Sequence, residues 1–308
     1  MMQRYLLIFI ILILAAISLI VKVGGVDSLV SDNVIRLAAT SEAPTESVIS
    51  AESVLNSANL SANLLLINKQ QNCSISYDAK AVSISELNKS AFFEFNSDNH
   101  WPIASLTKLM AALIALENFP LNKEIKMTEK AISAEGQAAG FEQGEIFTVR
   151  DLIKAMIIVS SNDAASALAE ALGENKFIDL MNQKASQLMM EETSFANPSG
   201  FSLLNQSTVK DLNILINHIY NKNQWILTIG QQKETEIFDL NSNKTRKLTN
   251  INQFAGQEDF LGGKSGYLES SGRNLISLFR RNDKIISVII LGSKDAYKET
   301  ENLLKCLQ

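Results

Sequence analysis

Cysteine and histidine are scarce in this sequence, which contains two of each among 308 residues. Structural zinc sites are built mainly from these two residue types, and neither a CxxC pair nor two neighbouring histidines occurs. The sequence therefore predicts no metal site. Cys73 and Cys306 could form a disulfide if the chain is exported, but two isolated cysteines are more often unpaired, so both states stay open.

An excess of basic residues is also missing. Lysine and arginine number 28 against 33 aspartates and glutamates, which gives a net charge of −5. A nucleic-acid surface needs a basic stripe, so we expect no nucleic acid among the partners. Hydrophobic residues make up 46% of the chain, which is enough for a full-sized core.

One long stretch carries no charge at all, the 17 residues from Tyr5 to Val21 that follow Arg4. As a helix it would span about 26 Å, enough to cross a slightly thinned bilayer. No convincing cleavage signal follows Lys22, so an uncleaved membrane anchor is favoured over a cleaved signal peptide. We expect residues 1–24 to be this anchor or signal, residues 25–60 a linker, and residues 61–308 a domain on the outer side of the cell membrane.

Strands are expected near both ends of this domain, with helices between them. Short apolar runs predict strands at Leu64–Ile67 and Ala91–Phe95, separated by an irregular polar segment. Helical spacing and the capping pairs Thr148-x-x-Asp151 and Thr208-x-x-Asp211 predict the helices. Their approximate ranges are 106–119, 148–157, 163–172, 176–190 and 208–219; strands follow at 261–268, 275–280 and 284–291, then a helix at 295–307. This order indicates an α+β fold, an antiparallel sheet packed against a helical block, preceded by one N-terminal transmembrane helix.

Ser105 and Lys108 stand three residues apart at the start of the first expected helix, so their side chains share one face. A serine hydroxyl is a weak nucleophile until an adjacent base takes its proton. A lysine is such a base only when it is neutral, which requires burial or a nearby cation. Taken alone, the pattern is more often an ordinary helix start with a capping serine and a solvated lysine.

Ser160-Ser161-Asn162 lies between two expected helices, after an apolar run. Ser160 could relay a proton to a leaving amine, and Asn162 could hold a substrate amide. A plain N-terminal cap for the following helix explains the same residues, and for an isolated segment it is the preferred interpretation.

Lys264 lies among glycines on an expected strand, where a ligand backbone could approach closely, as at Gly266. Lys264 would supply the cation that lowers the pKa of Lys108, and Ser265 would donate to a substrate carboxylate. The backbone N–H of Tyr267 could form an oxyanion hole with that of Ser105. The alternative is a glycine-rich turn with an exposed lysine.

The three motifs together, SxxK, SxN and Lys-Ser-Gly in this order, are those of penicillin-binding proteins and β-lactamases. The surrounding residues resemble the D-alanyl-D-alanine carboxypeptidase family closely, with Ser265 where threonine is usual. The resemblance covers residues 60–308, and its clearest segments are Pro102–Met110, Val159–Ala165, Thr193–Gly200 and Leu261–Tyr267.

The resemblance implies an enzyme that removes the terminal D-alanine from peptidoglycan stem peptides through an acyl-enzyme, without metal or cofactor. It also implies that β-lactams, which mimic this substrate, acylate the same serine. Residues 61–308 would be the catalytic domain, tethered by the N-terminal helix. Carried onto this sequence, the nucleophile is Ser105, its base is Lys108, the second motif is Ser160 with Asn162, and the substrate site is Lys264, Ser265, Gly266 and Tyr267.

Other functions share parts of this pattern. A D,D-endopeptidase would use the same apparatus, and a catalytically silent penicillin-binding module could retain it. A class A β-lactamase needs a glutamate that activates water, and neither Glu191 nor Glu192 shows the expected Glu-x-x-x-Asn spacing. A Ser-His-Asp hydrolase would have to use His100 or His218, and no GxSxG motif is present.

Overall fold

The computed structural model describes residues 78–136 and 139–307. Several predictions concern other residues and so lie outside the described ones: the anchor at 1–24, the linker at 25–60, the strand at 64–67 and the pairing of Cys73 with Cys306. Within the described part of the chain, no helix is both long and apolar enough to cross a bilayer.

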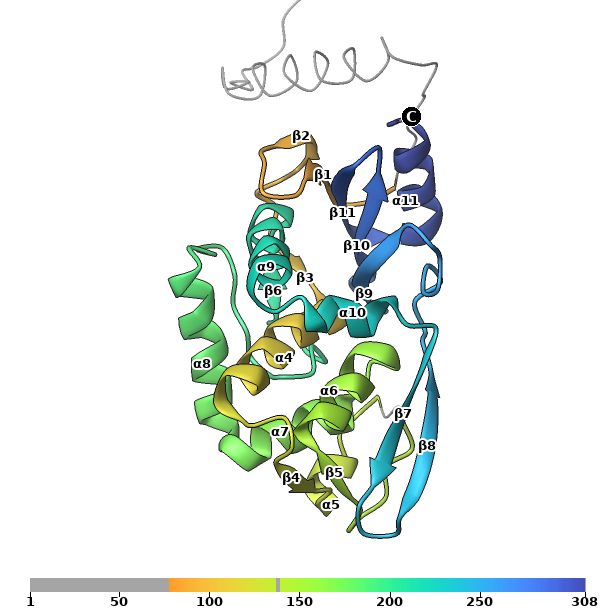
Figure 1. Ribbon diagram of the computed structural model, residues 1–308. Coiled ribbons are helices and arrows are strands. Elements are labelled where there is room, and N and C mark those ends of the chain that lie inside the picture. The colour runs from red at the N-terminus through yellow and green to blue at the C-terminus, as the bar shows by residue number, and fades with distance from the viewer. Residues whose placement is uncertain (1–77, 137–138, 308) are drawn as a thin grey trace, which may run out of the picture. The chain divides into compact units, whose positions relative to one another are not determined.

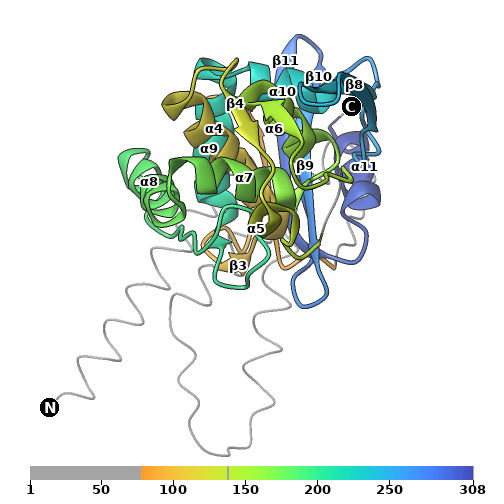
Figure 2. The ribbon, with the colours of Figure 1, turned by 90° about the horizontal axis from the view of Figure 1, so that it is seen from below.

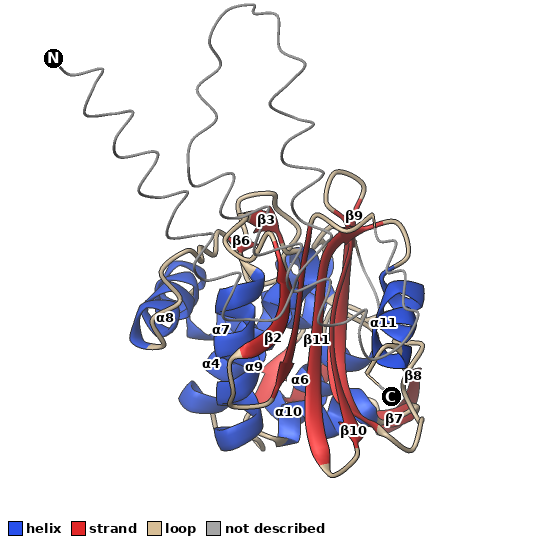
Figure 3. Cartoon of the chain, turned by 90° about the horizontal axis from the view of Figure 1, so that it is seen from above, coloured by secondary structure: helices blue, strands red, loops and turns tan. Residues whose placement is uncertain are grey.

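A five-stranded antiparallel sheet forms one layer of the domain (Figures 1 and 3), with strand order β2-β1-β11-β10-β9. β10 and β11 meet in a two-residue turn at Asn282 and Asp283, whose φ angles of 47° and 61° match the twist that tight hairpins prefer. β9 lies at the edge of the sheet. The bounds are β1 (Ala81–Glu86), β2 (Ala91–Phe95), β9 (Phe260–Leu268), β10 (Gly272–Arg281) and β11 (Lys284–Ser293).

β1 corrects one expectation, because it lies in the segment predicted to be irregular. Its sequence alternates apolar Val82 and Ile84 with polar Ser83 and Ser85, the period-two pattern of a strand, although both of its faces are buried. Val82 and Ile84 belong to one hydrophobic cluster, whereas Ser83 and Ser85 bond to Asn213 of α9 (Val209–Lys222) at 2.5 and 3.2 Å. This short alternation lies within a longer polar segment, and the prediction missed it, although the strand lies next to the centre of the sheet.

Helices cover both faces of the sheet, as Figure 3 shows from above. α11 (Ala296–Lys305) packs on one face through a cluster that includes Leu275, Val288 and Ile290. A helical block covers the opposite face, where Ile276 and Ile289 contribute to the larger cluster. The block comprises α4 (Thr107–Asn118), α5 (Glu129–Ile132), α6 (Val149–Ile158), α7 (Asn162–Leu172), α8 (Glu174–Gln187), α9 and α10 (Trp225–Gln231).

The remaining elements are short. Two-stranded pairs β3–β6, β4–β5 and β7–β8 lie outside the main sheet, and Figure 2 shows the domain from below with β3 and β8 at different edges of the view. Their bounds are β3 (Trp101–Pro102), β4 (Glu124–Lys126), β5 (Ile146–Thr148), β6 (Gln206–Ser207), β7 (Glu234–Asp239) and β8 (Lys244–Thr249), and a 3₁₀ turn, η1, covers Ala104–Leu106.

The predicted helix starts are confirmed by their caps. Thr148 Oγ1 accepts a hydrogen bond from the Asp151 N–H at 3.2 Å, and α6 begins at the next residue. Thr208 Oγ1 accepts from the Asp211 N–H at 3.1 Å and precedes α9 in the same way. The α+β class, with an antiparallel sheet against a helical block, is likewise confirmed.

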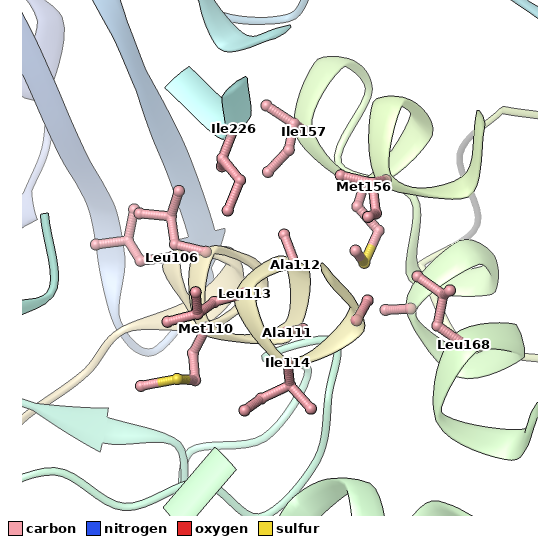
Figure 4. Close-up of a cluster of buried hydrophobic side chains, with 14 of the residues drawn as sticks. Leu106, Met110, Ala111, Ala112, Leu113, Ile114, Met156, Ile157, Leu168 and Ile226 are labelled. Atoms are coloured by element: carbon pink, nitrogen blue, oxygen red, sulfur yellow. The ribbon is translucent and has the colours of Figure 1, made fainter. Parts of the chain in front are cut away.

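α4 is the central helix of the block. Every residue from 107 to 115 is buried, and Figure 4 shows its side chains among Met156 of α6, Leu168 of α7 and Ile226 of α10. A helix that is apolar on all sides can exist only inside a core. Lys108 is therefore carried into the interior by its neighbours.

α10 and β9 approach closely because glycines stand at their contact. Gly262 has φ +125°, and a Cβ there would lie 2.4 Å from the carbonyl oxygen of Leu227. Gly262→Ala should therefore lower the free energy of unfolding by about 3 kcal/mol, combining backbone strain with overpacking. Urea denaturation measures this loss.

Gly144→Ala is the matched control, because Gly144 has φ +92° but no atom within 4 Å of its would-be Cβ. This substitution should lower the free energy of unfolding by about 1 kcal/mol, from backbone strain alone. Equal losses in the two variants would show that the contact between α10 and β9 is not tight.

Candidate active site

A cleft of about 390 Å³ lies where η1, the start of α7 and the edge strand β9 meet. All eight predicted site residues come together here. Lys108 and Lys264 are buried beneath the cleft, and each is bonded to a residue that lines it. The six that line it directly are Ser105, Ser160, Asn162, Ser265, Gly266 and Tyr267.

Ser105 sits in the 3₁₀ turn that leads into α4. The preceding residue, Ala104, has φ +50°, a conformation that an L-residue adopts at an energetic cost and that is common at functional sites. β9 approaches this turn closely at Gly266, where a Cβ would lie 2.8 Å from the Ser105 backbone nitrogen. A side chain at position 266 would thus block the space beside the Ser105 N–H.

The Lys108 amine has three oxygen neighbours: Ser105 Oγ at 2.9 Å, Asn162 Oδ1 at 2.6 Å and the Ser199 carbonyl at 2.5 Å. The amide and carbonyl oxygens can only accept hydrogen bonds. A neutral amine has two N–H groups and one lone pair, so donating to both of them leaves the lone pair for the Ser105 hydroxyl proton. This is the arrangement a base requires.

The electrostatic surroundings favour this neutral form. Burial, and secondarily the charge of Lys264, hold the pKa of Lys108 well below its usual value, while Asp163 acts in the opposite direction. The Asp163 carboxyl is itself buried, which raises its pKa to about 6. One of its oxygens, Oδ1, has no hydrogen-bond partner among the described residues.

Asn162 is held in one orientation. Its Nδ2 donates to the Glu135 carbonyl at 2.6 Å, so its Oδ1 must face Lys108. Ser161, the middle residue of the motif, caps α7 by accepting from the Ala164 N–H at 3.1 Å. The helix-cap interpretation is therefore correct for Ser161, while its two neighbours face the cleft.

Lys264 lies under the other side of the cleft. Its Nζ donates to Ser160 Oγ at 2.9 Å and to the Ser265 carbonyl at 2.7 Å. Burial lowers its pKa to about 7, so protonated and neutral forms coexist near neutral pH. Lys264 pairs with Ile276 and Ser265 with Leu275, which places the lysine on the helical face of the sheet and the serine on the α11 face.

The sequence did not reveal several supporting groups. The Ser199 carbonyl binds Lys108, and a Cβ at the adjacent Gly200 would lie 2.0 Å from the Ala104 carbonyl oxygen. The buried Asn205 amide donates to Thr107 Oγ1 at 3.1 Å and to the Asn197 carbonyl at 2.8 Å. The loop over residues 197–205 thus fixes the start of α4.

Arg273 is a further residue of the cleft that the sequence did not reveal. It stands opposite Tyr267 across the β9–β10 pair, its guanidinium lies 5.2 Å from that ring, and it lines the cleft. It brings a permanent positive charge beside Ser265, which suits an anionic end of a substrate. Pairing the two strands in register would have been the signal to find it.

The residues of the alternative mechanisms lie elsewhere. His100 Nε2 is 2.5 Å from a Glu192 carboxylate oxygen in an exposed pair, and His218 belongs to α9. Among the described residues that line the cleft there is no histidine, aspartate or glutamate. The geometry therefore gives no support to a Ser-His-Asp hydrolase or to a glutamate that activates water.

Comparison with known proteins agrees with this geometry. A family model described as D-alanyl-D-alanine carboxypeptidase matches residues 68–295. This chain belongs to that family.

Two relatives of the D-alanyl-D-alanine carboxypeptidase family illustrate the range of names within it. The chain is 35% identical over 214 residues to the D-alanyl-D-alanine endopeptidase of Haemophilus influenzae, covering 66% of this chain and 72% of that protein. It is 33% identical over 136 residues to the D-alanyl-D-alanine carboxypeptidase DacF of Bacillus subtilis, covering 42% of this chain and 35% of that protein.

The fold has solved counterparts. Penicillin-binding protein D2 from Listeria monocytogenes, in its ampicillin-bound form, has a TM-score of 0.68 and 28% identity, covering 76% of this chain and 98% of that chain. The chain is therefore a serine hydrolase of the D-alanyl-D-alanine carboxypeptidase family with the α+β fold of DD-peptidases.

Lys264 lowers the pKa of Lys108 and Asp163 raises it, which leads to a prediction for the pH dependence of acylation. Acylation that needs neutral Lys108 should accelerate as pH rises through the pKa of that amine. Lys264→Met removes a charge that lowers this pKa, so the acid limb of the pH–rate profile should move to higher pH. Asp163→Asn removes a charge that raises it, so the limb should move to lower pH.

The measurement is the rate constant for acylation by saturating benzylpenicillin as a function of pH. Between about pH 6 and pH 7 both Asp163 and Lys264 carry charge, so the contrast is clearest there. Asp179→Asn, on the exposed face of α8, serves as the control and should leave the profile unchanged. If the acid limb moved in the same direction in Lys264→Met and in Asp163→Asn, this electrostatic account would be contradicted.

Proposed function

We propose that this chain removes the terminal D-alanine from peptidoglycan stem peptides through an acyl-enzyme on Ser105. The observation that carries the proposal is the buried Lys108 amine, whose two acceptor-only neighbours leave its lone pair for the Ser105 hydroxyl 2.9 Å away.

In the first step, Ser105 Oγ attacks the carbonyl carbon of the penultimate D-alanine, and its proton passes to Lys108. The negative charge on the carbonyl oxygen is stabilised by the backbone N–H groups of Ser105 and Tyr267. When the C–N bond breaks, the proton that Lys108 took from Ser105 is delivered to the leaving amine through the Ser160 hydroxyl, which is also bonded to Lys264, and Lys108 is neutral again. D-alanine departs, and the acyl group remains on Ser105.

In the second step, water replaces the departed amine. Lys108 takes a proton from the water, the resulting hydroxide adds to the ester carbonyl, and collapse of the intermediate returns the proton to Ser105 Oγ. Asn162 holds the amide of the substrate chain during both steps, while its side-chain oxygen keeps Lys108 in place.

The free carboxylate of the terminal D-alanine would be held at the other end of the cleft. Ser265 donates a hydrogen bond, and Lys264 and Arg273 supply positive charge. A β-lactam has an amide carbonyl and a carboxylate at comparable positions, so it would acylate Ser105 in the same way. The ampicillin-bound Listeria relative supports this part of the proposal.

A membrane tether is a separate part of the proposal. The uncharged run from Tyr5 to Val21 would hold the catalytic domain at the outer face of the cell membrane, close to its peptidoglycan substrate. This tether accounts for both the N-terminal sequence and the substrate. N-terminal sequencing of the membrane-bound protein tests it, since a new terminus after residue 22 would indicate a cleaved signal.

The acylation itself gives the most direct test. Intact-protein mass spectrometry after exposure to benzylpenicillin should show one adduct of the whole drug, located on Ser105. Ser105→Ala should lose it completely, whereas Ser186→Ala, an exposed position on α8, should keep it. An adduct that persists in Ser105→Ala would refute the assignment, and rapid turnover of the drug would favour a β-lactamase.

An endopeptidase is the second candidate, because the Haemophilus relative carries that name at 35% identity. Both activities use the same cleft and differ in whether it admits a cross-linked chain beyond the cleaved bond. We expect a monomeric pentapeptide ending in D-Ala-D-Ala to be cleaved at least tenfold faster than a D-Ala-linked dimer. Comparing the two kcat/KM values measures this, and the reverse preference would establish the endopeptidase.

A further inference from the structure

Tyr297 places a buried hydroxyl group at the cleft that the mechanism does not use. It is the second residue of α11, its side chain is 8% exposed, and it lines the cleft together with Ala296. Its Oη makes no hydrogen bond of standard geometry with any of the described residues. Burying a hydroxyl without a partner destabilises the fold, so such a group calls for a functional explanation.

Aromatic packing fixes the Tyr297 ring. Phe254 meets it edge to face at a centroid distance of 5.2 Å. Phe254 in turn contacts Phe260 at 5.9 Å and Phe279 at 5.1 Å, in strands β9 and β10. The ring is therefore held in a set position on the α11 face of the sheet, at the wall of the cleft.

The groups around this hydroxyl are those assigned to the substrate carboxylate. Ser265 lies on the same face of the sheet as Tyr297, because its partner Leu275 belongs to the cluster that contains Tyr297. Arg273 lines the cleft from the neighbouring strand. The N-terminal end of the ten-residue helix α11 is also at this wall, and the positive end of a helix favours an anion.

The hydroxyl remains a donor under working conditions. Burial raises the pKa of Tyr297, while weak polar contacts of its hydroxyl with the Ser265 side chain and the Gln253 backbone, together with the charge of Arg273, lower it by less. A protonated phenol donates one hydrogen bond. A carboxylate offers about four lone-pair positions, enough to receive Arg273, Ser265 and one further donor.

We propose that the Tyr297 hydroxyl donates a hydrogen bond to the C-terminal carboxylate of the substrate and completes a subsite with Ser265 and Arg273. This inference rests on the proposed function and extends it. It makes the first turn of α11, a helix remote in sequence from all three motifs, part of the substrate-binding site.

Tyr297→Phe tests the role, because it removes the hydroxyl and keeps the ring. The readout is the second-order rate constant for acylation of the full chain by benzylpenicillin and by its methyl ester, in which the carboxylate is masked. The variant should lose about tenfold or more with the free acid, as expected for one hydrogen bond to a charged group, and less than twofold with the ester.

Tyr220→Phe, a half-buried tyrosine on α9, is the matched control and should lose nothing with either reagent. The melting temperature of Tyr297→Phe should equal or exceed that of the wild type, since an unpartnered hydroxyl has been removed. Equal losses with both reagents, no loss with either, or a clearly lower melting temperature would overturn the inference. Failure of the wild type to be acylated at all would instead refute the proposed function.

Discussion

The removal of two lysine amines from water is the constraint on which this structure depends. An isolated ammonium ion inside a protein is so unfavourable that the group either finds compensating charge or gives up its proton. Lys108 and Lys264 are both buried, and no carboxylate lines the cleft above them among the described residues. Burial therefore makes Lys108 a neutral base, whereas Lys264, whose pKa is lowered to about 7, remains partly charged near neutral pH.

The rest of the domain keeps the Lys108 amine buried and oriented toward Ser105. The apolar surface of α4 carries Lys108 inward, and neutral oxygens from Asn162 and Ser199 orient its amine without stabilising a positive charge as a carboxylate would. Backbone strain accompanies this arrangement, since both Ala104 and Ser160 have positive φ angles next to the reacting groups. The contacts of Asn205 with Thr107 and Asn197 hold the turn that follows Ala104 in place.

The sequence predicted the motif residues because chemistry restricts residue type at fixed spacing, as for Ser105 and Lys108. The helix starts at Thr148 and Thr208 were equally accessible, since a capping side chain acts locally. Backbone carbonyls such as that of Ser199 carry no residue-type signal.

Other features depended on packing between distant segments. The seven residues of α10 form a helix in contact with β9, and Arg273 is identified only by the register of β9 and β10. β1 shows only a short alternation within a polar segment, and its place in the sheet comes from its pairing with β11. The placement of Tyr297 required the packing of α11 against the sheet. Each of these features depends on contacts between segments far apart in the sequence, so no single segment predicts it.

The pairing of β1 with β11 joins segments about two hundred residues apart, for Ala81 lies opposite Leu291. Closing so large a loop is entropically costly and gives the topology a high contact order, which slows folding. The sheet cannot be completed until β11, which ends at Ser293, has left the ribosome. Until then Ser105 lacks the neighbouring strand β9, and Lys108 is not yet buried and stays protonated, so the serine is not activated before the domain is complete.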